Sequence, residues 1–512
     1  MKGSYSKYIH ARNVLGGYLS TKILLLFIIP AQLFSQFSNN IDSDLDATVF
    51  GQYEFENKKY EANKSKYKWL NHFCNYYLYY QQDSISNIII GPKFDFSLTN
   101  QGWENTRGLV LEGKIQNKLS FYSDFRESQS KPFDYVSEFV DSTGVYPSLG
   151  RVRPFNEDGY DYSRSQAYLV YDINPVFKIN LGYGNNFIGN GFRSLFLDRT
   201  NYSYPFVKIS TNLKRFNYYN LYTKFSSLEH KMSPTSGYAA KFGTFQCLEV
   251  DLTKKLKVGL FQGIIQGEDS IYVRSSIDFS YLNPIIFLRP VEYALGSPDN
   301  AIVGLFANLL LGEKTLLYGQ LMIDDINISK TMEGRGFFQN KNGFQLGVKY
   351  LNQGEHWTYR FGSEVNYVRP FSYAHKYNIQ NYTHLGEALA HQLGANFIEN
   401  VSWFGIDYKR FEGSLIATYY VQGVDQNGDS YGSNIFISDF QSIYGEHSFG
   451  NSFLQGKRKE VLLVKLSGAF MISRQNKLKA GAFIMPRMLN GNTTLYSGVF
   501  LRSHISGLNE LF

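Results

Sequence analysis

The sequence predicts an all-β fold, a transmembrane β-barrel of the outer-membrane kind. Many segments of strand length alternate between apolar and polar side chains, and an apolar segment typical of a secretion signal stands near the start. The connections between these segments are short and long in turn. A strand places successive side chains on opposite faces, so alternation with period two indicates strands. A soluble sandwich could show the same alternation, but its repetition behind a secretion signal favours a barrel.

The composition fits a protein that crosses a membrane with strands. The longest apolar run, Ile23 to Ile29, is far shorter than the roughly 20 residues that a spanning helix needs. Aromatic residues make up 17% of the chain and suit the girdles of a barrel. The net charge of +7 contains no run of five basic residues, so nucleic acid is not implied as a partner. Cys74 and Cys247 are too few for a disulfide framework.

The first 36 residues are predicted to be a signal peptide. Basic residues precede the apolar run, and Ala31 to Gln36 follows it, with cleavage expected after Ser35. Residues 37–105 are predicted to form a small periplasmic extension that leads into the first strand. Within it, the aromatic run Trp69 to Tyr80 fits either a short helix or a strand. Residues 106–512 are predicted to form the barrel.

Clean alternation starts at Gly108 and indicates a β-hairpin with one face suited to lipid. Leu109 opposes Val110, and after a turn at Gln116 the pattern continues, with Phe125 opposing Asp124. The segments around 281–325, 344–350, 359–367 and 462–501 alternate in the same way. We expect Arg at Leu346 or Leu321 to be costly, and Arg at the lumen-facing Gln345 or Gln320 to cost much less.

The lengths of the connections give an independent test of a barrel. Outer-membrane barrels have short periplasmic turns and long extracellular loops. The segments 312–314, 352–356 and 473–477 are short, whereas 325–342, 370–395 and 422–459 are long. The short ones all fall on one side if the last strand runs toward the periplasm. The long loops contain many Tyr, Asn, Gly and Ser residues.

Motifs that carry chemistry in other proteins are weak in this chain. The glycine-rich stretch Gly182 to Arg193 is not followed by a helical pattern, as a phosphate cradle would require. His375, His384 and His391 share one loop with Glu387, but their spacing matches no compact metal-ligand pattern. No catalytic residue, cofactor site or metal site is therefore predicted.

Six segments in order resemble the Wzi-type capsule assembly family, and the resemblance is strongest to its gliding-motility branch, the RemB-type proteins of Bacteroidetes-type bacteria. The segments that carry this resemblance are 105–113, 186–195, 204–208, 287–301, 316–320 and 389–397. The resemblance implies an outer-membrane barrel of about 18 antiparallel strands with a helical periplasmic element. It also implies a non-enzymatic protein that holds or assembles surface polysaccharide and serves gliding motility. Tyr183, Asn185 and Asn190 depart from the His, Lys and Asp that relatives carry there.

Two functions from different classes stay open on the sequence. The first is a barrel that holds surface polysaccharide (capsule or exopolysaccharide), with outer-membrane lipid as its other partner. The second is a porin-like conduit or a component of gliding or secretion machinery, with other motility or export components as partners. For the first, rings that stack on sugars and cations that meet acidic sugars are expected to lie in the long loops. The predicted contacts are Tyr373, Tyr377, Tyr382, Tyr431, Tyr444, Lys457 and Arg458.

The first testable prediction concerns maturation. We expect protein purified from outer membranes to begin near Gln36, because the apolar run and the residues after it read as a cleaved signal. Mass spectrometry of the intact protein measures this. A chain that keeps Met1 and fractionates with the inner membrane or cytoplasm would contradict the prediction.

Overall fold

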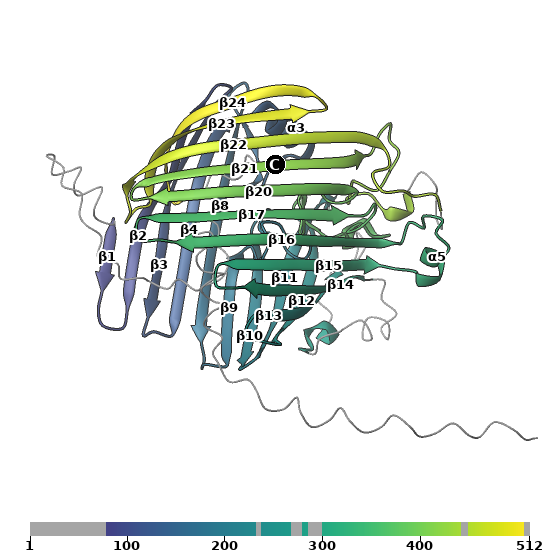
Figure 1. Cartoon of the computed structure of the whole chain (residues 1–512), viewed down its shortest axis with the longest axis horizontal. Helices are drawn as coiled ribbons and strands as arrows, with labels where there is room; N and C mark the ends of the chain where they lie inside the picture. The colour runs from purple at the N-terminus through teal and green to yellow at the C-terminus, as the bar shows by residue number, and fades with distance from the viewer. Residues whose placement is uncertain (1–77, 232–236, 268–278, 285–298, 442–448, 506–512) are drawn as a thin grey trace, which may run out of the picture.

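The computed structural model describes residues 78–231, 237–267, 279–284, 299–441 and 449–505. Within these residues, one antiparallel sheet of twenty strands contains the eighteen strands of a barrel that closes on itself (Figure 1). Closure occurs where β2 (Asn87–Thr99) pairs with both β3 (Trp103–Ile115) and the last strand, β24 (Asn492–Ser503). The all-β barrel predicted from the sequence is confirmed, including its strand number.

Each barrel strand pairs with the next along the chain, so the wall is a simple meander. Between β3 and β24 the strands are β4 (Leu119–Lys131), β8 (Gly159–Asp172), β9 (Phe177–Gly184), β10 (Tyr204–Leu213), β11 (Phe216–Lys231), β12 (Tyr238–Asp251), β13 (Leu256–Gln266), β14 (Asn300–Leu311), β15 (Thr315–Asp325), β16 (Lys341–Gln353), β17 (Trp357–Val368), β20 (Phe397–Tyr408), β21 (Phe411–Val424), β22 (Lys457–Ser473) and β23 (Leu478–Leu489).

The remaining elements lie in connections. They are β1 (Tyr79–Gln82), α3 (Asp134–Thr143), β5 (Val145–Tyr146), β6 (Gly150–Arg151), β7 (Arg153–Phe155), η2 (Phe279–Leu282), α5 (Ile328–Met332), η3 (Asn378–Gln380), β18 (Thr383–His384), β19 (Glu387–Ala388) and η4 (Asp439–Gln441). Among the described residues, no helix is both long and apolar enough to cross a membrane.

The two faces of the wall differ as the alternation predicts. On β15 and β16, Leu321 and Leu346 are 42% and 65% exposed, whereas their neighbours Gln320 and Gln345 are 5% and 2% exposed. Burial in a barrel wall means contact with the lumen, so the leucines form the outer face. Exposed Leu, Phe and Val side chains continue this outer face around the barrel, as on Leu109 and Phe125.

Exposed aromatic rings gather near the short turns. They belong to strands around much of the barrel and are Tyr171, Phe177, Phe216, Trp357, Phe411 and Phe470. The ring of Trp357 stacks on that of Tyr408 on the adjacent strand, with 4.1 Å between centroids. Amphipathic rings favour the boundary between lipid and water. This end of the barrel therefore has the aromatic girdle that the composition suggested.

The connections are sorted by length between the two ends of the barrel. The segments between β14 and β15, β16 and β17, and β22 and β23 are short, and all lie at one end. The long segments 326–340, 369–396 and 425–456 lie at the opposite end, as the sequence predicts. Two tight turns, at Asn100 and Asn490, also lie at the end with the long loops.

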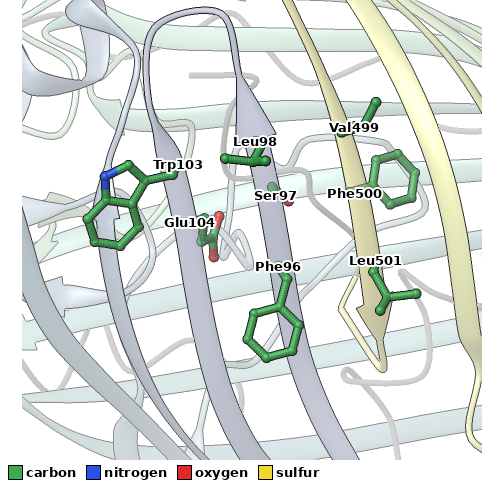
Figure 2. Close-up of a pocket in the computed structure, with 8 residues that line it drawn as sticks. All are labelled: Phe96, Ser97, Leu98, Trp103, Glu104, Val499, Phe500 and Leu501. Carbon is green, nitrogen blue, oxygen red and sulfur yellow. The ribbon is translucent and has the colours of Figure 1, made fainter.

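The closing seam is shorter than the other strand pairings. Six residue pairs join β2 to β24, from Phe94 and Ser503 to Thr99 and Gly498. Beyond them, the free edge of β2 pairs with β1, which covers the start of the strand. On the outer face, apolar side chains from three strands line a crevice beside the seam (Figure 2). They include Phe96, Leu98 and Trp103, so the seam presents the same apolar surface as the rest of the wall.

The first barrel strand begins earlier than the sequence suggests. β2 starts at Asn87, inside the segment 37–105 that the sequence assigns to an extension. It forms a hairpin with β3, which starts at Trp103. Its alternation is hidden by the apolar run Ile88 to Ile90, which occupies both faces. The signal, residues 37–77 and the terminal Phe512 lie outside the described residues. Cys247 is buried in the lumen as a free thiol.

The second testable prediction concerns the outer face. Leu346→Arg should lower the free energy of unfolding by about 2 to 4 kcal/mol, because the charge would enter the hydrocarbon layer. Glu355→Arg, in the exposed turn between β16 and β17, is the control and should change it little. Heat-modifiability on gels with urea titration reports the stability of the folded barrel. Equal losses for both variants would show that Leu346 does not face lipid.

Candidate functional site

The connection between β9 and β10 folds into the lumen and forms part of its core. Leu195, Phe196 and Leu197 from this segment are completely buried. The ring of Phe196 stacks on Phe261 of β13, with centroids 4.5 Å apart, and lies edge-on to Phe306 of β14. The described part of the lumen is therefore packed with side chains. We call residues 185–203 the plug segment.

The wall supplies hydrogen-bond partners for the backbone of the plug segment. Gln320 of β15 accepts from the backbone N–H of Leu195 at 2.8 Å, and its amide donates to the carbonyl of Ile188 at 3.1 Å. Gln345 of β16 donates to the carbonyl of Arg193 at 2.9 Å. We expected Arg at these two glutamines to cost much less than Arg at Leu346 or Leu321. Their burial and their contacts with the plug segment make that expectation wrong, because Arg would break the contacts and overfill the site.

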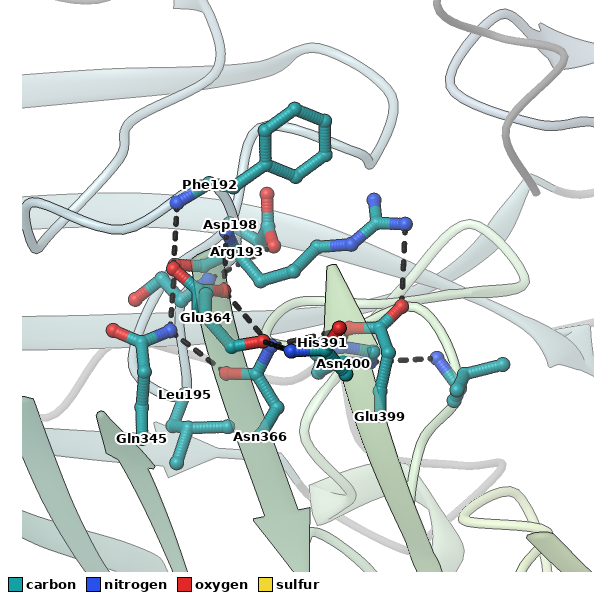
Figure 3. A network of polar contacts seen from close by, with 12 residues as sticks. Phe192, Arg193, Leu195, Asp198, Gln345, Glu364, Asn366, His391, Glu399 and Asn400 are labelled. Carbon is teal, nitrogen blue, oxygen red and sulfur yellow. Dashed lines mark hydrogen bonds and ion pairs between the residues drawn. The ribbon is translucent and has the colours of Figure 1, made fainter. Parts of the chain in front are cut away.

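A buried glutamate of β17 provides a second set of partners (Figure 3). The carboxylate of Glu364 accepts from the backbone N–H groups of Phe192 at 2.7 Å and Arg193 at 3.1 Å. It also accepts from the Tyr318 hydroxyl and the Asn366 amide, each at 2.8 Å. A side chain on Gly191 would come within 2.5 Å of this carboxylate, so the turn needs glycine.

Glu399 of β20 connects the plug segment to a second loop (Figure 3). Its carboxylate lies 2.6 Å from Nε2 of His391 and 3.5 Å from the guanidinium of Arg193. The other ring nitrogen of His391 accepts from the backbone N–H of Leu393 at 3.2 Å, which assigns the proton to Nε2. Asn366 donates to Glu364 and to Glu399 and so bridges the two carboxylates.

The loop between β17 and β20, residues 369–396, also lies inside the barrel mouth. Lys241 of β12 is fully buried and donates to the carbonyl and side chain of Asn381 and to the hydroxyl of Thr383, at 2.7 to 2.9 Å. The hydroxyls of Tyr373 and Tyr382 donate to the carbonyls of Leu195 and Phe196, at 2.9 and 2.8 Å. The loop therefore packs on the plug segment.

Two further long loops are tied to this assembly. Lys341 of β16 forms a buried ion pair at 2.6 Å with Asp439 of the loop between β21 and β22, and donates to the carbonyl of Ala374 at 2.9 Å. The loop between β4 and β8 is held by Glu387, which accepts from the backbone N–H of Ser148 at 2.6 Å. Glu387 also accepts from the N–H of Tyr202 at 2.8 Å.

The predicted polysaccharide contacts do not share one surface. Tyr373 and Tyr382 are 0% and 1% exposed, so the expectation that they meet a polymer is wrong for the folded barrel. Their hydroxyls donate hydrogen bonds inside the barrel, where a buried polar group must find a partner. Tyr377 and Tyr431 are partly exposed, Lys457 and Arg458 are exposed, and Tyr444 lies outside the described residues. The contact role of these five stays a prediction.

The three histidines of the loop have separate partners. Burial lowers the pKa of His384 to about 4, so its ring is neutral at pH 7. In that state Nδ1 accepts from the N–H of Ser226 at 3.1 Å, and Nε2 faces the carbonyl of Ser203 at 3.2 Å. Burial likewise lowers the pKa of His375 to about 4. Among the described residues, no group of His, Cys, Asp and Glu has the arrangement of a metal site.

Cations lie over aromatic rings where three long loops meet. The guanidinium of Arg335 lies 4.3 Å from the ring centre of Phe449, and the amine of Lys376 lies 5.0 Å from that of Phe440. Lys330 of α5 lies 4.5 Å from Phe337. We call these three cations and three rings the cationic rim. The loops that carry it are 326–340, 369–396 and 425–456, which the sequence does not show to be adjacent.

The cationic rim has a positive charge that is little neutralised. Arg335 is paired with Glu333 at 3.5 Å, and both side chains are exposed, so the pairing is weak. Lys376 is also exposed. The nearby carboxylate of Asp439 is used internally by Lys341. A ring beneath a cation restrains the position of the charge. Phe337 is 1% exposed, whereas Phe440 and Phe449 are partly exposed.

Comparisons with known proteins place the fold. No family model matches the chain, and no curated protein matches it. Among solved structures the chain is similar to Wzi of Escherichia coli, described as an outer membrane protein involved in group 1 capsule assembly and a carbohydrate-binding β-barrel. The TM-score is 0.53 at 11% identity, over 81% of this chain and 85% of that one.

Two further solved structures match less closely. OprD of Pseudomonas aeruginosa has a TM-score of 0.41 at 10% identity, over 81% of this chain and 94% of that one. OccAB2 of Acinetobacter baumannii has a TM-score of 0.42 at 10% identity, over 82% and 99%. At such identities the similarity concerns the fold alone. The Wzi-like barrel expected from the sequence is confirmed as a fold.

The third testable prediction concerns the anchoring of the plug segment. Glu364→Ala should lower the free energy of unfolding by about 3 kcal/mol, because it leaves two buried backbone N–H groups without an acceptor. Glu412→Ala is the control: its pairing with Lys479 at 3.1 Å is partly exposed, so about 0 to 1 kcal/mol should be lost. Unfolding in urea, followed by tryptophan fluorescence, measures both. A loss for Glu364→Ala no greater than that of the control would contradict the anchoring role.

Proposed function

We propose that this protein resides in the outer membrane and holds surface polysaccharide at the end with the long loops, without catalysing a reaction. The observation that carries the proposal is the cationic rim, where Arg335 and Lys376 lie over rings on an exposed surface. Ring faces bind the apolar faces of sugars, and cations bind acidic substituents. The Wzi-like fold supports the same reading, because Wzi is described as a carbohydrate-binding barrel.

The proposed orientation follows from the loops and the outer face. Long loops face the cell exterior in outer-membrane barrels, and short turns face the periplasm. The apolar outer face takes outer-membrane lipid as its partner. In this orientation the cationic rim, Lys457 and Arg458 would all face the cell exterior. Export would use the N-terminal signal, which would be cleaved.

Retention of the polymer would depend on many weak contacts. An exposed cation contributes on the order of 1 kcal/mol when it meets an acidic group. A long polysaccharide repeats its units, so several barrels can hold one chain at high effective concentration. A role in gliding motility, as in RemB-type proteins, would use this retention to couple the cell surface to an external polymer. That finer role is part of the proposal.

The alternative function, a porin-like conduit, has less support. Four long loops contribute buried residues to the lumen and the mouth of the barrel, and the plug segment fills space between opposite walls. An open aqueous path would require these segments to move out of the lumen. Their buried ion pairs and hydrogen bonds oppose such a movement. A component of secretion or motility machinery with an occupied lumen would still be compatible with this arrangement.

The fourth testable prediction concerns polymer retention. The double variant Arg335→Gln with Lys376→Gln should release surface polysaccharide into the medium, because it removes two positive charges from the cationic rim. Polysaccharide on washed cells and in the supernatant is measured with barrel abundance held equal. A further double variant, Lys457→Gln with Arg458→Gln, tests the basic pair expected from the sequence.

The matched control removes the same number of charges from the opposite end of the barrel. Lys254→Gln with Lys255→Gln changes the exposed turn between β12 and β13 and should leave retention unchanged. Retention that is equal in the rim variant and in this control would refute the role of the cationic rim. Loss of spreading without loss of polysaccharide would favour the machinery alternative.

A further inference from the structure

Two arginines face each other on adjacent strands inside the barrel. Arg126 of β4 and Arg164 of β8 are directly opposite in the strand register. Arg126 has the same parity as the buried Tyr122 and Asp124, and Arg164 has that of the buried Tyr162 and Gln166, so both project into the lumen. Like charges placed directly opposite each other on adjacent strands repel and destabilise a sheet.

A third cation lies in the same row across the wall. In the register, Lys93 of β2 pairs with Gly108 of β3, and Gly108 pairs with Arg126. Gly108 contributes no side chain, and a Cβ there would meet the backbone of β4, so no side chain stands between Lys93 and Arg126 in this row. Lys93 is 6% exposed and Arg126 is 9% exposed. The row therefore carries three positive charges in a largely buried position.

Among the described residues, Asp124 is the carboxylate that pairs with this row, and it does so through one of its two oxygens. Asp124 pairs with Lys93 at 3.0 Å, and the same oxygen accepts from the hydroxyl of Tyr122 at 2.8 Å. Glu387 lies near Arg164, but burial raises the pKa of its carboxyl to about 8, against the opposing effect of two N–H donors and Arg164. Neither carboxyl forms an ion pair with Arg126 or Arg164.

Each of the two guanidinium groups has a buried Nε without a hydrogen-bond acceptor. Arg126 makes no hydrogen bond or ion pair within the described residues, and its Nε is fully buried. Arg164 donates through one terminal nitrogen to the side-chain oxygen of Asn185, and its Nε is likewise buried without an acceptor. A buried cation without a partner is costly, so native proteins normally pair such groups. The two arginines therefore have donors available to an acceptor with negative charge.

We propose that Arg126 and Arg164 form a binding site for an oxyanion inside the barrel, with Lys93 adding positive charge beside it. The ligand is a carboxylate, phosphate or sulfate group, because planar guanidinium forks match the paired oxygens of such groups. A phosphate ion or the carboxylate of an acidic sugar would supply this chemistry. The site lies in the wall formed by β4 and β8, apart from the cationic rim, and does not depend on the proposed polysaccharide role.

The experiment measures thermal unfolding of the purified full-length mature barrel in a neutral detergent. Sodium phosphate, sodium sulfate and sodium glucuronate are each compared with sodium chloride at equal ionic strength. At least one oxyanion should raise the Tm of the unsubstituted protein beyond chloride, because a ligand that binds only the folded state stabilises it. Arg126→Gln and Arg164→Gln should abolish this increase. In chloride alone, neither variant should be less stable than the unsubstituted protein, since each removes a repulsive pair.

Two more variants make the result decisive. Arg126→Lys keeps the charge but loses the fork, so it should weaken oxyanion binding about tenfold or more and still fold. Arg360→Gln is the control: Arg360 is an arginine of the same barrel that already pairs with Asp407. This variant should keep the full oxyanion response. A response limited to glucuronate would indicate an acidic sugar, and one limited to phosphate or sulfate an inorganic or ester group. Absence of any response beyond chloride, or an equal response in Arg126→Gln, would overturn the proposal.

Discussion

The structure depends on supplying hydrogen-bond partners to a loop that is packed inside a barrel. The strands use their own backbone groups in the ladder around the wall, so the backbone of the plug segment needs partners from wall side chains and from the loop 369–396. Buried backbone groups without partners are costly. Gln320, Gln345 and Glu364 meet this requirement from three adjacent strands. The polar lumen face of these strands is therefore a structural requirement and not a sign of an open channel.

The same requirement determines which surface is available for function. Segments 185–203 and 369–396 bury their apolar and aromatic residues against one another, and only parts of the long loops remain exposed. The exposed parts come from loops that are distant in sequence and are held in place by buried ion pairs such as that of Lys341 with Asp439. A surface fixed in this way loses little conformational entropy when it binds a polymer. Order inside the barrel and the positions of the exposed loops at its mouth are thus parts of one arrangement.

Charge is distributed unevenly around the inner wall. On β16 and β20 buried charges are paired: Glu399 meets Arg193 and His391, and Lys341 meets Asp439. On β4 and β8, Arg126 and Arg164 are opposite each other and form no ion pair among the described residues. The strands with paired charges hold the plug segment, whereas β4 and β8 are suited to a ligand. A barrel can combine both because each strand presents one independent row of side chains to the lumen.

The sequence by itself determined the barrel, the two faces of its strands and the sorting of its loops, because alternation and connection length are local properties. The side chains of Leu346 and Gln345 are assigned to opposite faces by their parity alone. The sequence did not show the first barrel strand, because Ile88 to Ile90 are apolar on both faces of that strand. Only the tertiary structure decided that Tyr373 and Tyr382 are internal and that Arg335 and Lys376 lie at one surface. Such contacts join loops that are far apart in the chain, and no local sequence pattern indicates which loops are in contact.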